Sequence, residues 1–499
     1  MPGEPDGKAL KGMGKGWLGL VRCCYHTAIE PTPRPALRDR SAAFQSQQHQ
    51  FRVGGQAQRL QAVDFFNALT GAELLEKTDA LLPEHRERQY PPAVALAMFL
   101  KQALSEDRSC QRAVNGWIAQ CVAEGLKPPS VRTGGYCRAR RRLPEQMVTT
   151  LTREAGDLLC RQARTGWRWR GRPVKLGDGT GISMPDTREN QARYPQLSTQ
   201  AEGVGFPQMR LAGVVCLSTG AVLDAAMGPH AGKGSGELGL NRQLEHVFHA
   251  GDVFLADALY CNYFLIARLQ RLGVDVLFEQ NGARITDFRR GERLGARDHI
   301  VRWPKPAVRP QWMSQQDYKA FPKELTVREV KVAGRVLVTT MLDPRKTCKR
   351  ELGKLYARRW NIELDLRNIK TTLGMEVLSC KTPEMCEKEL WVYLLAYNLI
   401  RLLMAQAAVQ AGVHPRQLSF KHTVQLWTEW VAQGLAGSPA ERTTILFHAI
   451  AQQQVGDRPG RIEPRARKRR PKPYQWLKVP RKKARRQVRL YGYLPNPSA

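Results

Sequence analysis

The segment from Pro173 to Gln280 constrains the fold more than any other part of the chain, because strand and helix patterns alternate there in a fixed order. It begins with three strand-like runs: Val174 to Ile182, Met209 to Leu217 and Ala221 to Met227. The last two are separated by Ser218-Thr-Gly220, a spacing typical of a hairpin. A helical pattern from Glu237 to Phe248 follows.

A continuously apolar strand lies at the centre of this segment. Val253 to Ala256 carries apolar side chains on both faces and is flanked by Asp252 and Asp257, as in a strand buried on both sides. A helix at Tyr260 to Leu272 and a strand at Val274 to Gln280 complete the series. This order predicts an α/β layer built around a mixed sheet.

The part before the sheet differs in composition and in the periodicity of its apolar residues. Residues 1–55 lack sustained periodicity and predict a disordered leader with little function. Between 56 and 170, apolar residues recur at helical spacing, which predicts a helical domain. Its basic run Arg138 to Arg142 is compatible with contacts to a DNA backbone and equally with a solvated helix face. We therefore expect a helical DNA-binding domain at 56–170.

The part after the sheet is organised in four blocks. Residues 282–347 predict a β-rich insertion, with strands at Leu325 to Val332 and Arg335 to Met341. Two long helices are expected at Leu352 to Leu373 and Glu384 to Gln410. Shorter C-terminal helices are expected at 413–456, and a basic tail at 457–499.

The charge balance favours a polyanionic partner. The chain has 78 Lys and Arg against 45 Asp and Glu, a net charge of +33. Of these cations, 15 lie between Arg458 and Leu490 beside a single acid, Glu463, with no helical apolar stripe. A phosphate-binding tail fits this pattern better than a membrane helix, and a solvated tail with generic affinity for nucleic acid stays open.

The composition also excludes several classes of protein. The longest apolar runs, such as Trp391 to Ile400, fall short of the ~20 residues that cross a bilayer. The 11 cysteines form no paired C-x-x-C motif, so neither a disulfide framework nor a zinc site is indicated. We expect a cytoplasmic, nucleoid-associated protein with no membrane partner.

Four polar residues in the helix expected at 352–373 suggest chemistry. Tyr356, Arg359, Glu363 and Lys370 fall within about 60° of one another on a helical wheel. One carboxylate among a phenol, a guanidinium and an ammonium can hold a phosphate beside a metal ion. The alternative is an exposed face with an Arg359–Glu363 pair four residues apart, which stabilises a helix by only a few tenths of a kcal/mol.

The same four residues match the Y-(2)-R-(3)-E-(6)-K signature, so the chain resembles a group of bacterial insertion-sequence DDE transposases. The context of two aspartates strengthens the resemblance: Asp178 in Leu-Gly-Asp-Gly-Thr, and Asp257 at the end of the buried strand. The resemblance spans about residues 60 to 455. It implies an RNase H-like catalytic core at 171–281 and 348–412, interrupted by the β-rich insertion.

The resemblance also implies roles for individual residues. Asp178, Asp257 and Glu363 are expected to be catalytic and to bind two Mg²⁺ or Mn²⁺ ions, with Asp178 bridging them. Tyr356, Arg359 and Lys370 are expected to hold a DNA phosphate beside a flipped base. Trp360, and Trp303 or Trp312 in the insertion, offer surfaces on which that base could stack, although core packing is an alternative for each.

Each acid also has a structural interpretation. Asp178 could be a turn residue, and Asp257 could cap the following helix. Asp252 and Asp186, which lie near the expected catalytic acids, are interpreted as structural. His246 and His249 form an H-x-x-H pair without a third ligand at suitable spacing, so zinc is not expected there.

Together these features predict an enzyme that binds the ends of its insertion sequence and catalyses excision and strand transfer by two-metal phosphodiester chemistry. Its partners would be double-stranded DNA, at the element ends and the target, and a second copy of the chain in the DNA complex. Two alternatives stay open. One is a non-catalytic DNA-binding protein derived from such an element, and the other is a related metal-dependent nuclease without strand transfer.

Overall fold

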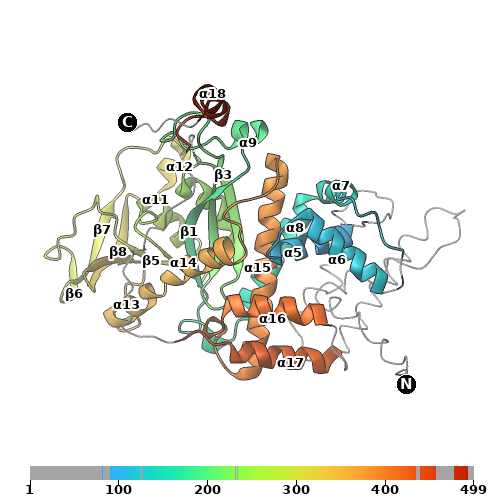
Figure 1. The fold of residues 1–499 in the computed structure, drawn as a ribbon. Coiled ribbons are helices and arrows are strands. Elements are labelled where there is room, and N and C mark those ends of the chain that lie inside the picture. The colour runs from blue at the N-terminus through green and yellow to red at the C-terminus, as the bar shows by residue number, and fades with distance from the viewer. Residues whose placement is uncertain are drawn as a thin grey trace, which may run out of the picture.

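A computed structural model describes residues 92–123, 127–230, 234–433, 439–456 and 477–492, together with Leu81, Tyr90, Gly125 and Gly232 (Figure 1). The expected leader at 1–55, the first part of the expected helical domain and most of the basic tail lie outside the described residues.

The described strands form one nine-stranded mixed sheet in the order β3-β2-β1-β4-β5-β9-β8-β7-β6. Strands β1, β4 and β5 are parallel, whereas every other neighbouring pair is antiparallel. The strands are β1 (Val174–Ser183), β2 (Gln208–Cys216), β3 (Val222–Pro229), β4 (Val253–Ala256), β5 (Asp275–Glu279), β6 (Glu292–Gly295), β7 (Asp298–Pro304), β8 (Glu324–Val332) and β9 (Arg335–Thr339).

Helices cover both faces of the sheet. Before β1 come α5 (Pro92–Leu104), α6 (Cys110–Ala123), α7 (Gly134–Arg142), α8 (Glu145–Arg161) and the 3-10 turn η2 (Thr165–Trp167). Within the sheet region lie α9 (Arg188–Arg193), α10 (Glu237–Asn241), the 3-10 helix η3 (Arg242–Val247), α11 (Tyr263–Arg271) and α12 (Gln315–Ala320). After the sheet come α13 (Lys349–Ala357), α14 (Trp360–Arg367), the π-helical turn η4 (Asn368–Thr372), α15 (Pro383–Ala411), η5 (Pro415–Gln417), α16 (Phe420–Gln433), α17 (Pro439–Gln452) and α18 (Arg481–Tyr491).

The alternation of side chains along the strands divides the core into two layers. Leu176, Leu255 and Leu277 belong to the layer that also contains α8, α14 and α15. Phe254 and Phe278 point the other way, into the layer with α10, η3 and α11. Successive residues of a strand point to opposite faces, so odd and even positions separate cleanly in β2, β4 and β5, whereas an irregularity in the pairing of β2 with β3 interrupts the alternation in β3.

Helix α15 connects the N-terminal helices, the sheet and the C-terminal helices. Figure 1 shows it running between the sheet and the N-terminal helices, and it packs against α5, α8, α16 and α17. Helices α5 to α8 therefore share one hydrophobic core with the sheet. By length and composition α15 could cross a membrane, but 89% of its most apolar window is buried inside the protein, as in the core helix of a folded domain.

The order of strands and helices agrees with the sequence-based prediction, and the bounds of the predicted strands differ by at most two residues. The expected insertion at 282–347 contains β6 to β9, with the short helix α12. These strands do not form a sheet of their own, because β9 pairs with β5 and continues the central sheet.

Three helix predictions were wrong in detail. The single helix expected at Leu352 to Leu373 is broken by a turn at Arg358-Arg359 and ends in the π-helical turn η4. The helix expected at Glu237 to Phe248 is short and continues as a 3-10 helix. The helix expected from Tyr260 begins at Tyr263, because Asn262 caps it by accepting a hydrogen bond from the Leu265 amide.

The basic run in α7 is partly a core feature. Arg140 is buried, stacks on Phe99 with its guanidinium carbon 4.6 Å from the ring centroid, and donates to Gln102. Arg141 and Arg142 are exposed. The interpretation of the whole run as a DNA contact is therefore wrong for Arg140, whereas DNA binding by this region stays a prediction.

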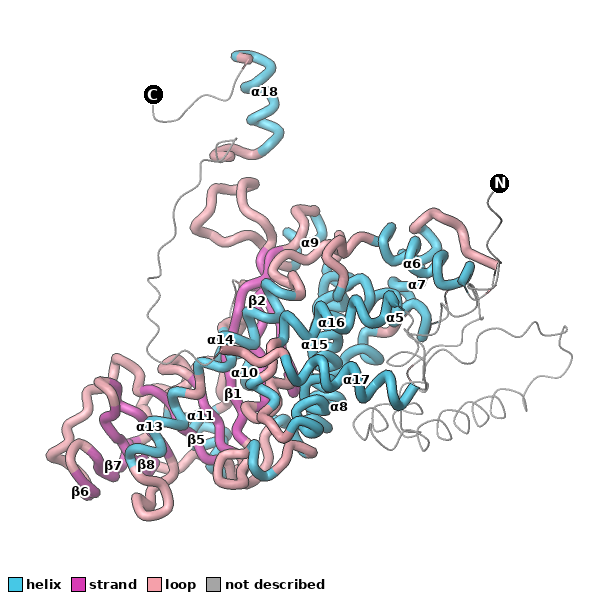
Figure 2. The backbone as a smooth tube through the Cα atoms, turned by 60° about the horizontal axis from the view of Figure 1, so that its bottom comes forward, coloured by secondary structure: helices cyan, strands magenta, loops and turns pink. Residues whose placement is uncertain are grey.

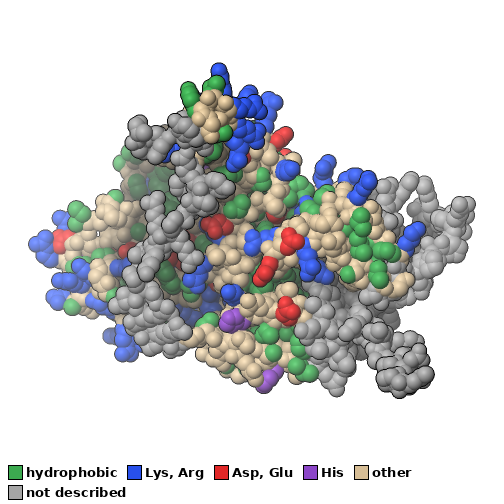
Figure 3. Space-filling view, in the orientation of Figure 1, with side chains coloured by type: hydrophobic (Ala, Val, Ile, Leu, Met, Phe, Trp, Pro, Cys, Tyr) green, Lys and Arg blue, Asp and Glu red, His purple; other side chains and the backbone are tan. Residues whose placement is uncertain are grey.

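The described end of the basic tail is helical, which corrects the expectation that no helical apolar stripe runs through the tail. Helix α18 carries Ala484, Val488 and Tyr491 on one side, at positions separated by four and three residues. Its six cations are Arg481, Lys482, Lys483, Arg485, Arg486 and Arg489. Lys and Arg side chains gather over α18 in Figure 3, and Figure 2 shows the helix standing away from the sheet.

Candidate active site

Strands β1 and β4 bring Asp178 and Asp257 to the same level of the sheet. Leu176 of β1 is level with Leu255 of β4, so the residues two positions further along each chain are level as well. Neighbouring strands lie about 4.8 Å apart. The two aspartates are therefore adjacent, although 79 positions separate them in the sequence (257 − 178).

Asp178 faces the layer that contains α14, and Asp257 directly follows the last residue of β4. Asp178 has the same parity as Leu176 within β1, and Leu176 lies in the core beneath α14 and α15. Helix α14 packs against β1. The helix that carries Glu363 thus covers the face of the sheet on which Asp178 lies.

The Asp178 carboxyl has an unusual environment. Its pKa is raised to about 7, mainly by burial and also by the nearby Glu237 and Asp257 carboxylates, while a hydrogen bond from the Gly179 amide and the Arg359 guanidinium oppose the rise. Among the described residues, no Lys, Arg or His nitrogen lies within 4.0 Å of Asp178, Asp257 or Glu237. No cation therefore pairs directly with this group of acids, and Arg359 acts on Asp178 from a greater distance.

Glu363 lies in a different environment from the aspartates. Its carboxylate accepts a hydrogen bond from Arg359 Nη2 at 2.7 Å, four residues earlier. The side chains of Arg359 and Glu363 are 16% and 33% exposed, so this ion pair is half-buried and not a fully solvated surface pair. The ion pair expected from the spacing is thus present at the edge of the candidate site, but it does not lie on an exposed helix face.

The two other polar residues of the signature contact the ends of neighbouring strands. Lys370 Nζ donates to Thr180 Oγ1 at 3.0 Å, two residues after Asp178. Tyr356 donates its hydroxyl to Glu279 at 3.1 Å, and Glu279 ends β5. The turn at Arg358-Arg359 and the π-helical turn η4 change the angular spacing of the four signature residues around the helix. All four nevertheless remain on the side that faces the edge of the sheet.

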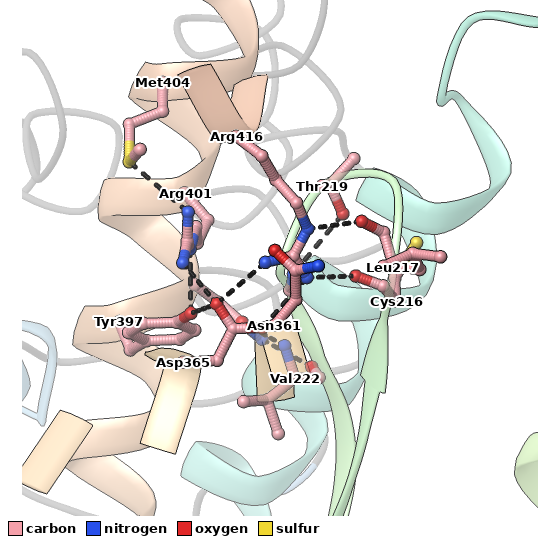
Figure 4. A network of polar contacts seen from close by, with 12 residues as sticks. Cys216, Leu217, Thr219, Val222, Asn361, Asp365, Tyr397, Arg401, Met404 and Arg416 are labelled. Carbon is pink, nitrogen blue, oxygen red and sulfur yellow. Dashed lines mark hydrogen bonds and ion pairs between the residues drawn. The ribbon is translucent and has the colours of Figure 1, made fainter. Parts of the chain in front are cut away.

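A buried network fixes α14 against the rest of the core (Figure 4). The fully buried Asp365 accepts hydrogen bonds from Tyr397 Oη at 3.0 Å and Arg401 Nη2 at 2.5 Å, both on α15. Arg416 Nη2 donates to the same carboxylate at 2.9 Å, and Arg416 also donates to the Leu217 carbonyl in the turn between β2 and β3. Asp365 follows Glu363 by two residues, so this network also holds the backbone that carries Glu363.

The tryptophans proposed for base stacking differ in accessibility. Trp360 begins α14 and is 46% exposed. Trp312 is 45% exposed, and the Arg242 guanidinium lies 4.0 Å from its ring centroid. Trp303 is buried and donates to Glu329 at 2.8 Å, so the core-packing alternative holds for Trp303.

The chain is similar to known transposases over most of its length. Residues 169–399 match the family model described as a transposase DDE domain. The chain is 28% identical over 403 residues to the transposase InsG for insertion sequence element IS4 of Escherichia coli (strain K12), covering 78% of this chain and 88% of that protein. The chain is a DDE transposase.

A solved structure of the piggyBac transposase in a synaptic complex with hairpin DNA covers 78% of this chain and 82% of its own, at 10% identity and a TM-score of 0.37. A likeness at this level does not define a shared fold. The family model spans the sheet, α13, α14 and most of α15, so the matched region contains every candidate site residue of the transposase.

The neighbouring acids and histidines of the transposase have structural partners. Asp252 is buried and forms an ion pair with Lys175. Asp186 accepts from Gln191 Nε2 at 2.8 Å at the surface. His246 contacts Asp224, and no third ligand joins His246 and His249 among the described residues. The alternative role for Asp257 as a helix cap does not hold, because Asn262 caps α11 and Asp257 accepts from the Leu259 amide in the turn before it.

The sequence reasoning missed two acids of this region. Glu279 is level with Asp257, since Ala256 pairs with Phe278, and Arg335 forms an ion pair with it. Glu237, on α10, approaches Asp178 and Asp257 from the other layer. Glu279 directly follows an apolar strand, which is the same signal that identified Asp257, whereas no sequence pattern marked Glu237.

No group of three or more His, Cys, Asp or Glu side chains in the described part of the transposase is gathered closely enough to hold a metal ion. The chemistry of the donors nevertheless fits a hard divalent cation. Carboxylate oxygens are the preferred ligands of Mg²⁺, and no cation pairs directly with the acids around Asp178. Glu363 can join them only if its carboxylate exchanges Arg359 for another partner.

Proposed function

We propose that this transposase binds the ends of its own insertion sequence and catalyses excision and strand transfer at the Asp178, Asp257 and Glu363 carboxylates. The strongest support is the placement of Asp178 and Asp257 at one level of adjacent parallel strands, beneath the helix that carries Glu363. The similarity to the transposase of an insertion sequence element supports the substrate class. The protein would act in the cytoplasm at the nucleoid.

We further propose an RNase H-like core and membership of the Y-R-E-K group. Support for the core comes from the order β3-β2-β1-β4-β5, with β1, β4 and β5 parallel and β2 and β3 antiparallel. Support for the group comes from Tyr356, Arg359, Glu363 and Lys370, which match every position of the signature.

Asp178, Asp257 and Glu363 would hold two Mg²⁺ or Mn²⁺ ions, with Asp178 shared between them. Such ions, when bound, activate a water or a 3′-hydroxyl and stabilise the leaving 3′-oxygen. The remaining residues bind and orient DNA. Arg359 and Lys370 are cations beside Asp178 and Thr180 and would hold the phosphates next to the scissile one, while Trp360 offers a partly exposed ring for a flipped base.

A plasmid assay tests the catalytic role. The substrate is a supercoiled plasmid that carries the DNA flanking the coding sequence, scored for nicking, excision and joining in Mg²⁺. Asp178→Asn, Asp257→Asn and Glu363→Gln should each abolish cleavage while DNA-end binding stays within a few-fold. Asp186→Asn, an exposed aspartate outside the site, is the matched control and should cut normally.

The same assay separates the alternatives. A related nuclease would nick without joining, and a non-catalytic binding protein would retain end binding without any metal-dependent cleavage in the wild type. Near wild-type cleavage by Asp257→Asn would remove the assignment of the site. Dimerisation is tested by mixing two chains of different length on end DNA, where a homodimer gives one intermediate band in a gel-shift experiment.

A further inference from the structure

Glu237 lies between the segments that carry the two catalytic aspartates. A Cβ added to Gly179, the residue after Asp178, would lie 2.5 Å from the Glu237 carboxyl carbon. The Glu237 carboxylate therefore occupies the space that a side chain at position 179 would fill. The Oε1 oxygen of Glu237 accepts a hydrogen bond from Tyr260 Oη at 2.8 Å, and Tyr260 closes the turn that begins at Asp257.

The early end of β4 allows the Glu237 carboxylate to reach Asp178 and Asp257. Glu237 belongs to α10, in the layer opposite α14. However, β4 ends at Ala256 while β1 continues to Ser183, so β4 no longer covers the edge of β1 beyond Asp178. Because Gly179 has no side chain, a carboxylate from the far layer can reach the site there.

The charges around Glu237 distinguish it from the other acids. Glu363 is paired with Arg359, and Glu279 with Arg335. Glu237, Asp178 and Asp257 have no cationic nitrogen within 4.0 Å among the described residues. Arg359 and Arg210 lie farther away and lower the pKa of Asp178 and of Glu237, but both pKa values remain raised, so these three half-buried carboxylates that repel one another are still costly to keep together.

We propose that Glu237 is a fourth carboxylate of the catalytic site and contributes, directly or through a water molecule, to binding the divalent cation held by Asp178 and Asp257. This inference rests on the metal-dependent function proposed above. In it, Tyr260 and the Gly179 amide hold the Glu237 carboxylate in place, and its remaining lone pairs are available to the cation. The glycine after Asp178 is then needed to admit this carboxylate.

Mn²⁺ binding to the full-length protein without DNA tests the inference, measured by electron paramagnetic resonance of the free ion. Glu237→Gln keeps the shape of the side chain and an acceptor for Tyr260 but removes the charge. We expect it to weaken Mn²⁺ affinity by about ten-fold or more, within the range found for residues that support metal ligands. Tyr260→Phe keeps the charge of Glu237 and should weaken Mn²⁺ affinity less than Glu237→Gln does.

Two further variants complete the design. Gly179→Ala should displace Glu237, whose carboxylate is the flexible end of a side chain, and so weaken Mn²⁺ affinity as Glu237→Gln does. Glu279→Gln is the matched control, because Arg335 already neutralises Glu279, and it should leave Mn²⁺ affinity unchanged. Thermal unfolding of each variant checks that the fold is retained.

Asp257→Asn makes the two proposals separately testable. If Asp257→Asn abolishes Mn²⁺ binding and Glu237→Gln does not weaken it, the role of Glu237 is overturned while the catalytic site stands. Equal losses in Glu237→Gln and Tyr260→Phe, or in Glu237→Gln and Glu279→Gln, would also overturn it, because a shared hydrogen bond or a general field would then be responsible. If the wild type binds no Mn²⁺, or Asp257→Asn binds it normally, the proposed metal site itself fails.

Discussion

Arg359 Nη2 lies 2.7 Å from the Glu363 carboxylate, so the third acid of the candidate site is held by a residue of the same signature. The Arg359 guanidinium is also close enough to Asp178 to influence its charge. In the protein without DNA, Arg359 therefore occupies the position of a counter-cation between the helix and the strand. A phosphate that binds Arg359 would release Glu363 toward the aspartates.

This relationship predicts opposite effects of Arg359→Ala on metal and on DNA. Removal of the guanidinium frees Glu363, so Mn²⁺ affinity of the DNA-free protein should rise by a few-fold. Assembly of the complex with end DNA and the steps after the first nick should weaken, because alanine cannot bind the phosphate. Arg367→Ala, an exposed arginine at the end of the same helix, should change neither quantity. Weaker Mn²⁺ binding in Arg359→Ala would contradict the idea that Glu363 exchanges Arg359 for the metal ion.

The raised pKa of Asp178 predicts a pH dependence of stability in the metal-free protein. The pKa of this carboxyl is about 7 in the folded protein against 3.8 for an ordinary aspartate. The folded state then binds more protons than the unfolded state between these values, so the contribution to stability is present below pH ~4 and is lost as the pH rises through 7. Between pH 4.5 and 7.5 the Tm of the chelator-treated wild type should fall more steeply than that of Asp178→Asn.

Added Mn²⁺ should reverse part of this loss at pH 7.5, since a bound cation favours the ionised carboxylate. Parallel Tm curves for the wild type and Asp178→Asn across this pH range would argue against the raised pKa.

The buried network around Asp365 predicts a large effect on stability. Asp365→Ala leaves the buried Arg401 and the nearly buried Arg416 without their carboxylate. Removal of one partner of a buried ion pair costs about 3–5 kcal/mol in the free energy of unfolding. Asp157→Ala, which breaks an exposed pair with Arg161, should cost no more than about 1 kcal/mol. Urea denaturation measures both, and similar small losses in the two variants would mean that the network adds little stability.

The basic tail predicts that its deletion changes how DNA affinity depends on salt concentration. If residues 458–490 bind phosphates, their deletion should weaken binding to any duplex and flatten the slope of log K against log salt by roughly 0.9 for each phosphate that the tail neutralises. Preference for the element ends should persist. Deletion of residues 493–499, which carry no charge, is the control. An unchanged slope after the larger deletion would show that the tail, including α18, does not touch DNA.

Local patterns in the sequence were sufficient for much of the fold. The apolar run Val253 to Ala256 and the alternation along 174–182 correctly predicted buried strands, because burial on one or both faces dictates where apolar residues recur. The same patterns placed Asp178 within one strand and Asp257 at the end of another. They could not indicate the break at Arg358-Arg359, since both sides of the break are good helical sequence.

The sequence by itself determined the large positive charge, the strands and helices of the central region, and the spacing of Tyr356, Arg359, Glu363 and Lys370. Only the tertiary structure decided which of these groups meet. Lys370 contacts Thr180 across 190 positions, and Glu237 reaches Gly179 from a helix in the opposite layer. The physical reason is that periodicity along the chain reports which face of an element is buried, whereas the partners across that face depend on how the strands align and where each one ends.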